Sequence, residues 1–249
     1  MWLHHLVRYA MAASLVLVVV AWWMKDSLPP AAGLRAELLE EPRQSKVSRK
    51  PIEMSVNGVD YRVQPRYSYE LSGLVVSMHH SDSWWDYAHR EWNDHINLMD
   101  LCVVWGRNVS SGAYRDFSFS NDQWTCSLQA KSMEAHKAFD YAGASNNHMV
   151  TDDAGVARDL RRLHVGDQIR VRGYLVDYTT FKGGQPAGTR VSSEVRTDTG
   201  NGACEVLYVE AVELLGSANR GWRLAYKAAL ALLLLSIIAW VALPVKYND

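Results

Sequence analysis

The sequence predicts a mainly β protein: a small, OB-like antiparallel barrel with one or two helices, flanked by two transmembrane helices. Two observations lead to this fold class. Each end of the 249-residue chain carries an uncharged apolar run, and the segments between these runs alternate apolar and polar residues, the period of half-buried strands. The formal net charge of −1 argues against a nucleic-acid partner, which would need a clear basic excess.

Residues 6–25 and 224–245 are the predicted transmembrane helices. About 20 apolar residues of a helix span the hydrocarbon core of a bilayer, and each run approaches that length. A cleaved signal peptide at the first run, or a buried hairpin of two apolar helices, is the alternative. The first run is long for the apolar region of a signal peptide, so we expect two spans and a lipid bilayer as partner.

Residues 26–65 are predicted to form a stalk or linker. Prolines interrupt this segment at positions 29, 30, 42, 51 and 65, which favours a semi-rigid spacer. Within it, Asn57 and Gly58 stand between alternating apolar residues, which is typical of a small β-hairpin.

Residues 66–216 are predicted to form the β domain. The expected strands are "YELSGLVVSM", "LCVVWG", "DFSFS", "QWTCSLQA", "VGDQIRVRGYLVDY" and "CEVLYVEAVELL". Residues 82–97 and 156–163 have helical character. Several short strands, with a helix after the first and another before the long fourth, are typical of a small barrel.

The segment "VGDQIRVRGYLVDY", Val165–Tyr178, resembles the fourth strand of OB-fold proteins, in which a Gly-Asp turn opens a strand of the form V-x-V-x-G-x-L. The helical segment before it agrees with that fold, whereas the long insertion after the first strand departs from it. The resemblance implies an OB-like barrel at the level of strand order. The whole chain also resembles uncharacterised bacterial inner-membrane proteins, which implies a location and no function.

Histidine, aspartate and tryptophan residues are most concentrated in residues 77–102. One interpretation is an amphipathic helix that buries Trp85 and Trp92, with Asp86 and Arg90 paired on its other face. The other is an aromatic binding surface, since exposed aromatic rings are enriched where interfaces form. Its candidate residues are Trp84, Trp85, Trp92, Arg172 and Tyr174.

The same segment offers a candidate polar site. Its candidate residues are His79, His80, Asp86, His89 and the distant His148. Adjacent residues of a strand point to opposite faces, so His79 and His80 cannot both contribute, and no metal ion is predicted. The segment "ASNNHM", residues 144–149, is expected to form a hydrogen-bonded loop, with a role for His148 as ligand or general base as the alternative.

The remaining motifs disfavour an enzyme. The Asp-Thr-Gly triplet at residues 198–200 occurs once and lacks the apolar flanks of an aspartic protease, so a Gly-rich turn is expected there. The sequence has no Walker A loop, G-x-S-x-G, C-x-x-C or H-E-x-x-H motif. We therefore expect no cofactor.

These observations predict a membrane-anchored β-barrel module that binds a membrane or envelope protein, or another envelope component, without catalysis. The alternative is a membrane-tethered hydrolase, metal-dependent or not, that uses residues 79–95 and His148. Co-purifying proteins would favour the first function, and bound metal would favour the second.

The cysteines bear on the side of the membrane. Lys and Arg near the spans lie mostly on the domain side, but long loops cross a membrane largely regardless of charge. A bond between Cys126 and Cys204, each in an expected strand, would restrain the unfolded chain by about 4 kcal/mol and would persist only in an oxidising compartment. Two unpaired cysteines are the alternative, and Cys102 is expected to be a buried free thiol. The prediction is a two-pass protein of the bacterial inner membrane with a periplasmic domain, cytoplasmic termini and a Cys126–Cys204 disulfide.

Overall fold

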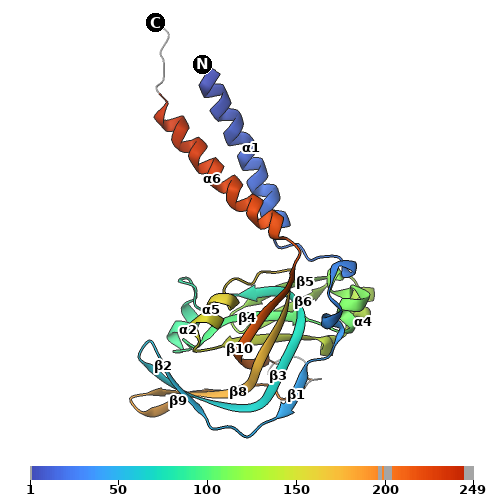
Figure 1. The fold of residues 1–249 in the computed structure, drawn as a ribbon, viewed down its shortest axis with the longest axis vertical. Helices are drawn as coiled ribbons and strands as arrows, with labels where there is room; N and C mark the ends of the chain where they lie inside the picture. Colours follow the sequence, from blue (N-terminus) through green and yellow to red (C-terminus); the bar gives the residue numbers. More distant parts are fainter. Residues whose placement is uncertain (1, 196–197, 199–203, 244–249) are drawn as a thin grey trace. The chain divides into compact units, whose positions relative to one another are not determined.

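The computed structural model describes residues 2–195, 198 and 204–243 (Figure 1). The chain divides into two compact units. One unit combines the two chain ends, residues 1–27 and 218–249, and the other comprises Leu28–Ser217.

The unit formed by the chain ends is a pair of apolar helices, α1 (Trp2–Met24) and α6 (Arg220–Ala242). The helices lie against each other (Figure 1), and the ring of His4 meets the edge of Trp240 at 5.6 Å between centroids. Asn219, just before α6, donates a hydrogen bond to the carbonyl oxygen of Ser27, just after α1. Both helices are long and apolar enough to cross a membrane, and few of their residues are buried within the protein. The two apolar helices are therefore confirmed and are compatible with a membrane protein.

The second unit is mostly β sheet with a few short helices. Its strands are β1 (Arg43–Lys46), β2 (Ile52–Val56), β3 (Val59–His79), β4 (Asn97–Val104), β5 (Phe117–Asp122), β6 (Thr125–Ala130), β7 (Ala144–Val150), β8 (Asp167–Lys182), β9 (Gln185–Arg190) and β10 (Cys204–Ser217). Its α-helices are α2 (Tyr87–Glu91), α3 (Arg107–Ser111), α4 (Met133–Ala138) and α5 (Ala154–Leu160).

The main sheet follows the order β1-β3-β4-β7-β10-β8-β9, and β8 also pairs with β3. The β5–β6 hairpin forms a separate two-stranded sheet. The described strand pairs are antiparallel, as predicted, except for β7 and β10, which run parallel. A parallel pair needs a long connection, and α5, β8 and β9 supply it here.

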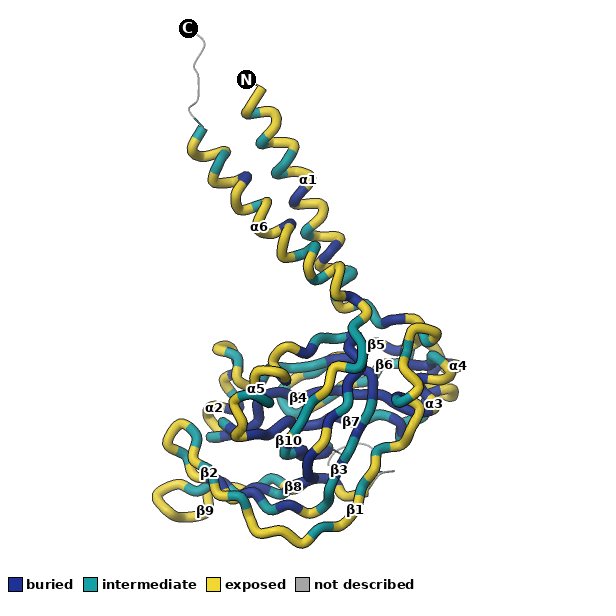
Figure 2. The backbone as a smooth tube through the Cα atoms, in the orientation of Figure 1, coloured by how far each residue is buried: buried dark blue, intermediate teal, exposed yellow. Residues whose placement is uncertain are grey.

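The main core lies on one face of these strands. Alternate residues of β3, β4, β7, β8 and β10 meet there, and these include Leu71, Val75, Leu101, Met149, Ile169, Val171 and Leu207. The tube in Figure 2 is accordingly buried along the central strands and exposed at the hairpin tips. A second cluster packs β5, β6, α3 and α4 over the opposite face of β3 and β4. Both faces of β4 are thus covered, which explains why every residue of that strand is buried.

A stalk was expected over residues 26–65. Of these, residues 28–65 belong to the same compact unit as the sheet. Leu38 is fully buried, and β1 and β2 both pair with β3. The predicted hairpin is present between β2 and β3, where Asn57 and Gly58 have φ of 53° and 77°. These left-handed conformations are the ones that a two-residue hairpin turn requires.

Two local predictions differ from the structure. The helix expected over residues 82–97 is only α2, which Asp86 caps by accepting from the backbone N–H of His89. Trp85 and Trp92 flank this short helix and are 67% and 75% exposed, so they do not form a buried stripe. The segment "ASNNHM", expected to be a loop, is most of β7.

Candidate functional site

Polar side chains gather on the face of β4, β7 and β10 that is turned away from the main core. In register, Asp100 of β4 lies opposite His148 of β7, and Cys204 of β10 lies opposite Asn146 of β7. Opposed residues share a face, as do residues two apart on one strand. The sheet therefore places Asp100, His148, Asn146 and Cys204 side by side.

Asp100 and His148 form a buried pair. Nδ1 of His148 lies 2.7 Å from Oδ1 of Asp100, and both side chains are almost completely inaccessible. Burial by itself lowers the pKa of His148, but the charge of Asp100 and its hydrogen bond raise that pKa to about 9. Burial likewise raises the pKa of Asp100, but the charge and hydrogen bond of His148 outweigh it and lower that pKa. The imidazole is therefore held by Nδ1, and its Nε2 faces other groups.

Two further side chains contact the imidazole of His148. Arg190 brings Nη1 to 3.2 Å, a contact in which a neutral imidazole accepts. Cys204 offers a side-chain hydrogen bond to the same imidazole, which favours its protonated form. The imidazole thus has Arg190 and Cys204 as neighbours in addition to Asp100.

Cys204 is a half-buried free thiol. Its Sγ lies 3.9 Å from Nδ2 of Asn146 and 3.9 Å from the backbone oxygen of Trp124. A thiol beside a cationic imidazole or guanidinium is the environment in which cysteines become nucleophilic. His148 is the neighbour of this kind that Cys204 has here.

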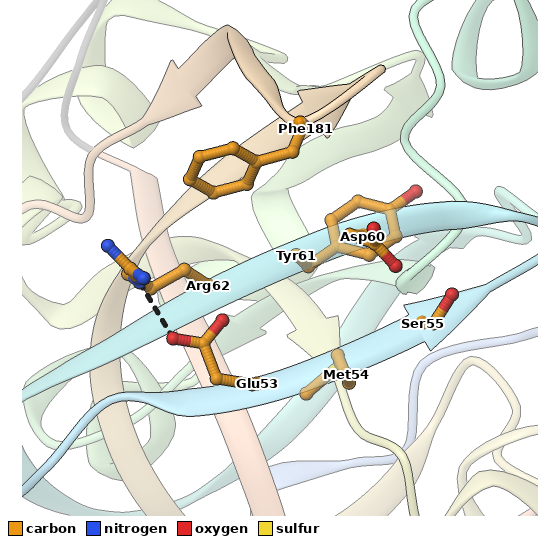
Figure 3. Close-up of a pocket in the computed structure, with 8 residues that line it drawn as sticks. Glu53, Met54, Ser55, Asp60, Tyr61, Arg62 and Phe181 are labelled. Carbon is orange, nitrogen blue, oxygen red and sulfur yellow. Dashed lines mark hydrogen bonds and ion pairs between the residues drawn. The ribbon is translucent and has the colours of Figure 1, made fainter.

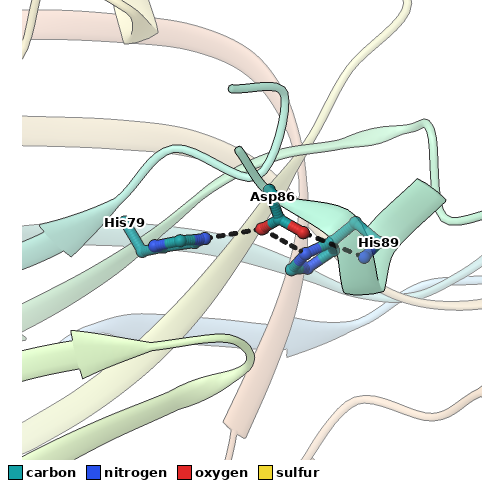
Figure 4. A group of neighbouring side chains, drawn as sticks. All are labelled: His79, Asp86 and His89. Carbon is teal, nitrogen blue, oxygen red and sulfur yellow. Dashed lines mark hydrogen bonds and ion pairs between the residues drawn. The ribbon is translucent and has the colours of Figure 1, made fainter. Parts of the chain in front are cut away.

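A second group of ionisable residues adjoins the first. His79 at the end of β3 and His89 of α2 reach Asp86 from opposite sides (Figure 4). Nε2 of His79 and Nδ1 of His89 lie 2.6 and 2.8 Å from the same carboxylate oxygen, Oδ2. Burial raises the pKa of Asp86, but hydrogen bonds from His79 and His89 and the charge of His89 lower it overall. This group can hold a metal ion, since it combines two imidazoles and a carboxylate.

Asn97 joins the two groups. Its Nδ2 donates to Oδ1 of Asp100 at 2.9 Å and lies 3.3 Å from Nε2 of His89. Within the described part of the chain, no hydrogen-bond partner faces Oδ1 of Asn97 or Oδ2 of Asp100, although both atoms are buried. These two oxygens can accept hydrogen bonds from a ligand or from water.

Trp124, in the β5–β6 turn, packs against both groups. Its ring lies 4.6 Å from that of His89 and 5.4 Å from the guanidinium of Arg190. Its Nε1 donates to Asp94, which also accepts from the hydroxyl of Tyr178 at 2.6 Å. Burial, followed by the charge of Asp94, raises the pKa of Tyr178 well above its usual value. This hydroxyl is a hydrogen-bond donor to Asp94 and not a base.

The predicted binding surface is only partly assembled. Trp84 is 77% exposed and meets the edge of the exposed Trp85 at 5.2 Å. Trp92 lies 5.9 Å from Trp124, beside the polar groups. Tyr174 was predicted to belong to this surface, but its side chain is buried. The guanidinium of Arg49 lies 4.5 Å from its ring.

Two further predicted residues lie apart from the site. Arg172 is exposed on β8, in register with Glu70 of β3. His80 is half-buried, and burial, ahead of the opposing charge of Asp82, lowers its pKa. Ligand atoms of His79, Asp86 and His89 lie within 4.8 Å of one another, and His80 does not belong to this group.

The prediction of a Cys126–Cys204 disulfide is wrong. The structure joins Cys126 to Cys102, with 5.8 Å between the Cα atoms. The β5–β6 hairpin packs over β4, whereas Asn146 of β7 separates Cys102 from Cys204 across the sheet. Of the Asp-Thr-Gly triplet at residues 198–200, Thr199 and Gly200 lie outside the described residues.

An open pocket lies elsewhere, between the β2–β3 hairpin and the end of β8 (Figure 3). Arg62 and Glu53 face it and are 2.7 Å apart. The guanidinium of Arg62 also lies 5.6 Å from the ring of Phe181. Glu53 and Arg62 pair with each other, and Asp60 is the remaining charged lining residue. The described lining residues include no cysteine or histidine, and this makes the pocket a weaker candidate than the face of β4, β7 and β10.

Comparison with family models, with curated proteins and with solved structures finds no match for this chain.

Sequence reasoning did not single out Asp100, Asn97, Arg190, Trp124 or the thiol of Cys204 as site residues. One signal was present. Asp100 interrupts the otherwise apolar run "LMDLCVVW", residues 98–105, and a carboxylate in a buried strand needs a partner. That partner, His148, lies 48 residues away in the chain.

Proposed function

We propose that this chain is a membrane-anchored hydrolase whose nucleophile is Cys204, with His148 as proton donor and acceptor and Asp100 as the group that orients His148. The alignment of these three side chains on adjacent strands carries the proposal. Nucleophile, base and orienting carboxylate in sequence-distant positions are the arrangement that acyl transfer uses on many unrelated folds.

The proposed chemistry is hydrolysis of an ester, thioester or amide. The Cys204 thiolate attacks the carbonyl carbon, a C–S bond forms, and the leaving group departs with the proton from Nε2 of His148. Water then attacks the thioester while His148 takes a proton from it, and Cys204 leaves as the thiolate, which restores the starting pair of thiolate and imidazolium. The raised pKa of His148 suits the first step, in which the ring must arrive protonated.

The neighbouring groups suggest a substrate with negative charge near the reacting carbonyl. Arg190 is partly exposed and contacts the imidazole. Nδ2 of Asn146 points at the sulfur and is a donor for the oxygen that becomes negative in the transition state. Trp124 provides an apolar wall beside both.

The same proposal takes the fold to be an OB-like barrel. The pairings support this, because β3 pairs with β4, β4 with β7, β7 with β10, β10 with β8, and β8 with β3. Helix α5 precedes β8 in the chain, which agrees with the resemblance of residues 165–178 to the fourth strand of OB folds. The site then lies on the outer surface of this barrel.

We also propose that the domain is extracytoplasmic, in a bacterial inner-membrane protein with cytoplasmic termini. The Cys102–Cys126 disulfide supports this side, because disulfides persist in oxidising compartments and are rare in the cytosol. The two apolar helices support the two-pass topology.

Thiol reactivity of the purified full-length protein tests the proposed enzyme. The chain has three cysteines, and with two of them bonded, iodoacetamide should label Cys204 alone. We expect His148→Gln to slow labelling at about pH 7 by roughly tenfold, and p-nitrophenyl acetate hydrolysis to disappear in Cys204→Ser. The exposed His136→Gln is the matched control. Equal labelling rates in both histidine variants, or ester hydrolysis that persists in Cys204→Ser, would rule the proposal out.

A second candidate function is binding of a membrane or envelope protein without catalysis. The exposed tryptophans of the segment around α2, Trp84, Trp85 and Trp92, favour it, because exposed aromatic rings are enriched at interfaces. Crosslinking in cells followed by purification in mild detergent tests it. A partner retained by the wild type and lost in Trp84→Ala and Trp85→Ala would support it, and equal recovery would refute it.

A further inference from the structure

We propose that His79, Asp86 and His89 form a binding site for one divalent transition-metal ion of the zinc class. The site shares no residue with the proposed thiol centre, so it stands or fails independently of that function. Its donors come from the end of β3, the cap of α2 and the first turns of α2.

The donor atoms are already gathered. One atom from each residue lies within 4.8 Å of the others, and Oδ2 of Asp86 is within 2.8 Å of both ring nitrogens. Nitrogen and oxygen ligands bind zinc at about 2.0–2.2 Å in a tetrahedron, which separates neighbouring donors by about 3.3 Å. The ring nitrogens must therefore withdraw from Oδ2 by roughly half an ångström, a movement within the reach of side-chain rotation.

The surroundings hold the carboxylate in place for this role. Oδ1 of Asp86 accepts from the backbone N–H of His89 at 3.0 Å, which leaves Oδ2 turned toward the two rings. The side chains of Asp86 and His89 are buried, whereas His79 is 18% exposed. An ion can therefore enter from the side of His79.

The ligand set selects the class of ion. Two imidazoles and one carboxylate suit zinc and its neighbours in the first transition row, whereas calcium and magnesium prefer all-oxygen sites. Three protein ligands leave a fourth position for water or a substrate group, as in catalytic rather than structural zinc sites.

Metal binding by the untagged full-length protein in detergent tests this site. After chelation and dialysis against zinc or cobalt(II), we expect one ion per chain and, for cobalt, the visible absorption of a tetrahedral complex. His79→Ala should weaken binding by about 100-fold or more, since even second-sphere partners contribute 10–100-fold. His80→Ala is the matched control, because it removes the adjacent imidazole that lies outside the cluster.

His79→Ala also removes a hydrogen bond to the buried carboxylate of Asp86, so the near-UV circular dichroism of the metal-free variant must match that of the wild type before lost binding is assigned to a lost ligand. Asp86→Asn tests the carboxylate in the same way, with the near-UV circular dichroism of the metal-free protein as the check of folding. Cys204→Ser should bind the ion as the wild type does, which separates this site from the proposed thiol centre. A wild-type protein that takes up no ion, or one whose binding survives His79→Ala or is lost in His80→Ala or Cys204→Ser, would overturn the proposal.

Discussion

Replacing Asp100 by Asn should remove a pH-dependent part of the stability of the β domain. The folded protein raises the pKa of His148 from 6.5 to about 9. Each unit of pKa shift corresponds to about 1.4 kcal/mol, so a difference of 9 − 6.5 = 2.5 units corresponds to about 3 kcal/mol. The lowered pKa of Asp100 describes the same pair and adds no second contribution in this pH range.

The sign follows from linkage. Because the pKa of His148 is higher in the folded state, its contribution to stability is fully present below the unfolded value of 6.5 and is lost as the pH rises through about 9. The neutral amide introduced by Asp100→Asn cannot supply the negative charge that favours imidazolium, and burial alone lowers the pKa of His148. We therefore expect this variant to lack the loss of stability between these two values.

Thermal unfolding of the full-length protein in detergent, followed by tryptophan fluorescence at about pH 6 and about pH 10, measures this difference. For a domain of this size, about 3 kcal/mol corresponds to roughly 6–12 °C in melting temperature. Subtracting the change in Asp100→Asn from the change in the wild type cancels the other groups that titrate in this range.

Asp82→Asn is the control. It breaks an exposed ion pair with Arg161, 2.6 Å apart, and exposed pairs contribute less than about 1 kcal/mol. If Asp100→Asn loses as much stability as the wild type between the two pH values, His148 is not held protonated by Asp100 and the reasoning fails.

Three further predictions concern the fold. Gly173→Ala should lower the free energy of unfolding by about 3 kcal/mol, because a Cβ there would lie 1.9 Å from a backbone oxygen of β10. Gly188→Ala, which has open space around it, is the control. Equal melting temperatures of the two variants would contradict the close contact at Gly173. Replacing Cys102 and Cys126 together by Ser should lower the free energy of unfolding by about 3 kcal/mol, because a bond across 24 residues restrains the unfolded chain by that amount. A melting curve identical to that of the wild type would argue against the bond. Gly58→Ala should lower the free energy of unfolding by about 1 kcal/mol, because the φ of 77° at this position is unfavourable for a residue with a Cβ. An unchanged free energy of unfolding in urea titration would show that the turn has another geometry.

Local patterns in the sequence were enough to predict the elements whose cause is local. The apolar runs predicted α1 and α6, and alternation predicted most strands, because both signals depend on neighbours within one helix or strand. The Asn57-Gly58 turn was predictable for the same reason, since its backbone conformation depends on two residues. The structure of residues 82–97 was not predictable from local pattern. The spacing of the tryptophans in this segment fits a long helix with a buried stripe as well as it fits a short helix with exposed flanks.

Only the tertiary structure decided the site. Asp100, His148 and Cys204 lie on three strands, and their meeting depends on the parallel pairing of β7 with β10, which no local pattern reports. The disulfide was decided in the same way, because Cys126 reaches Cys102 only when the β5–β6 hairpin packs over β4. Composition determined which groups were present in the chain. Strand register, a long-range property set by core packing, determined which of them became neighbours.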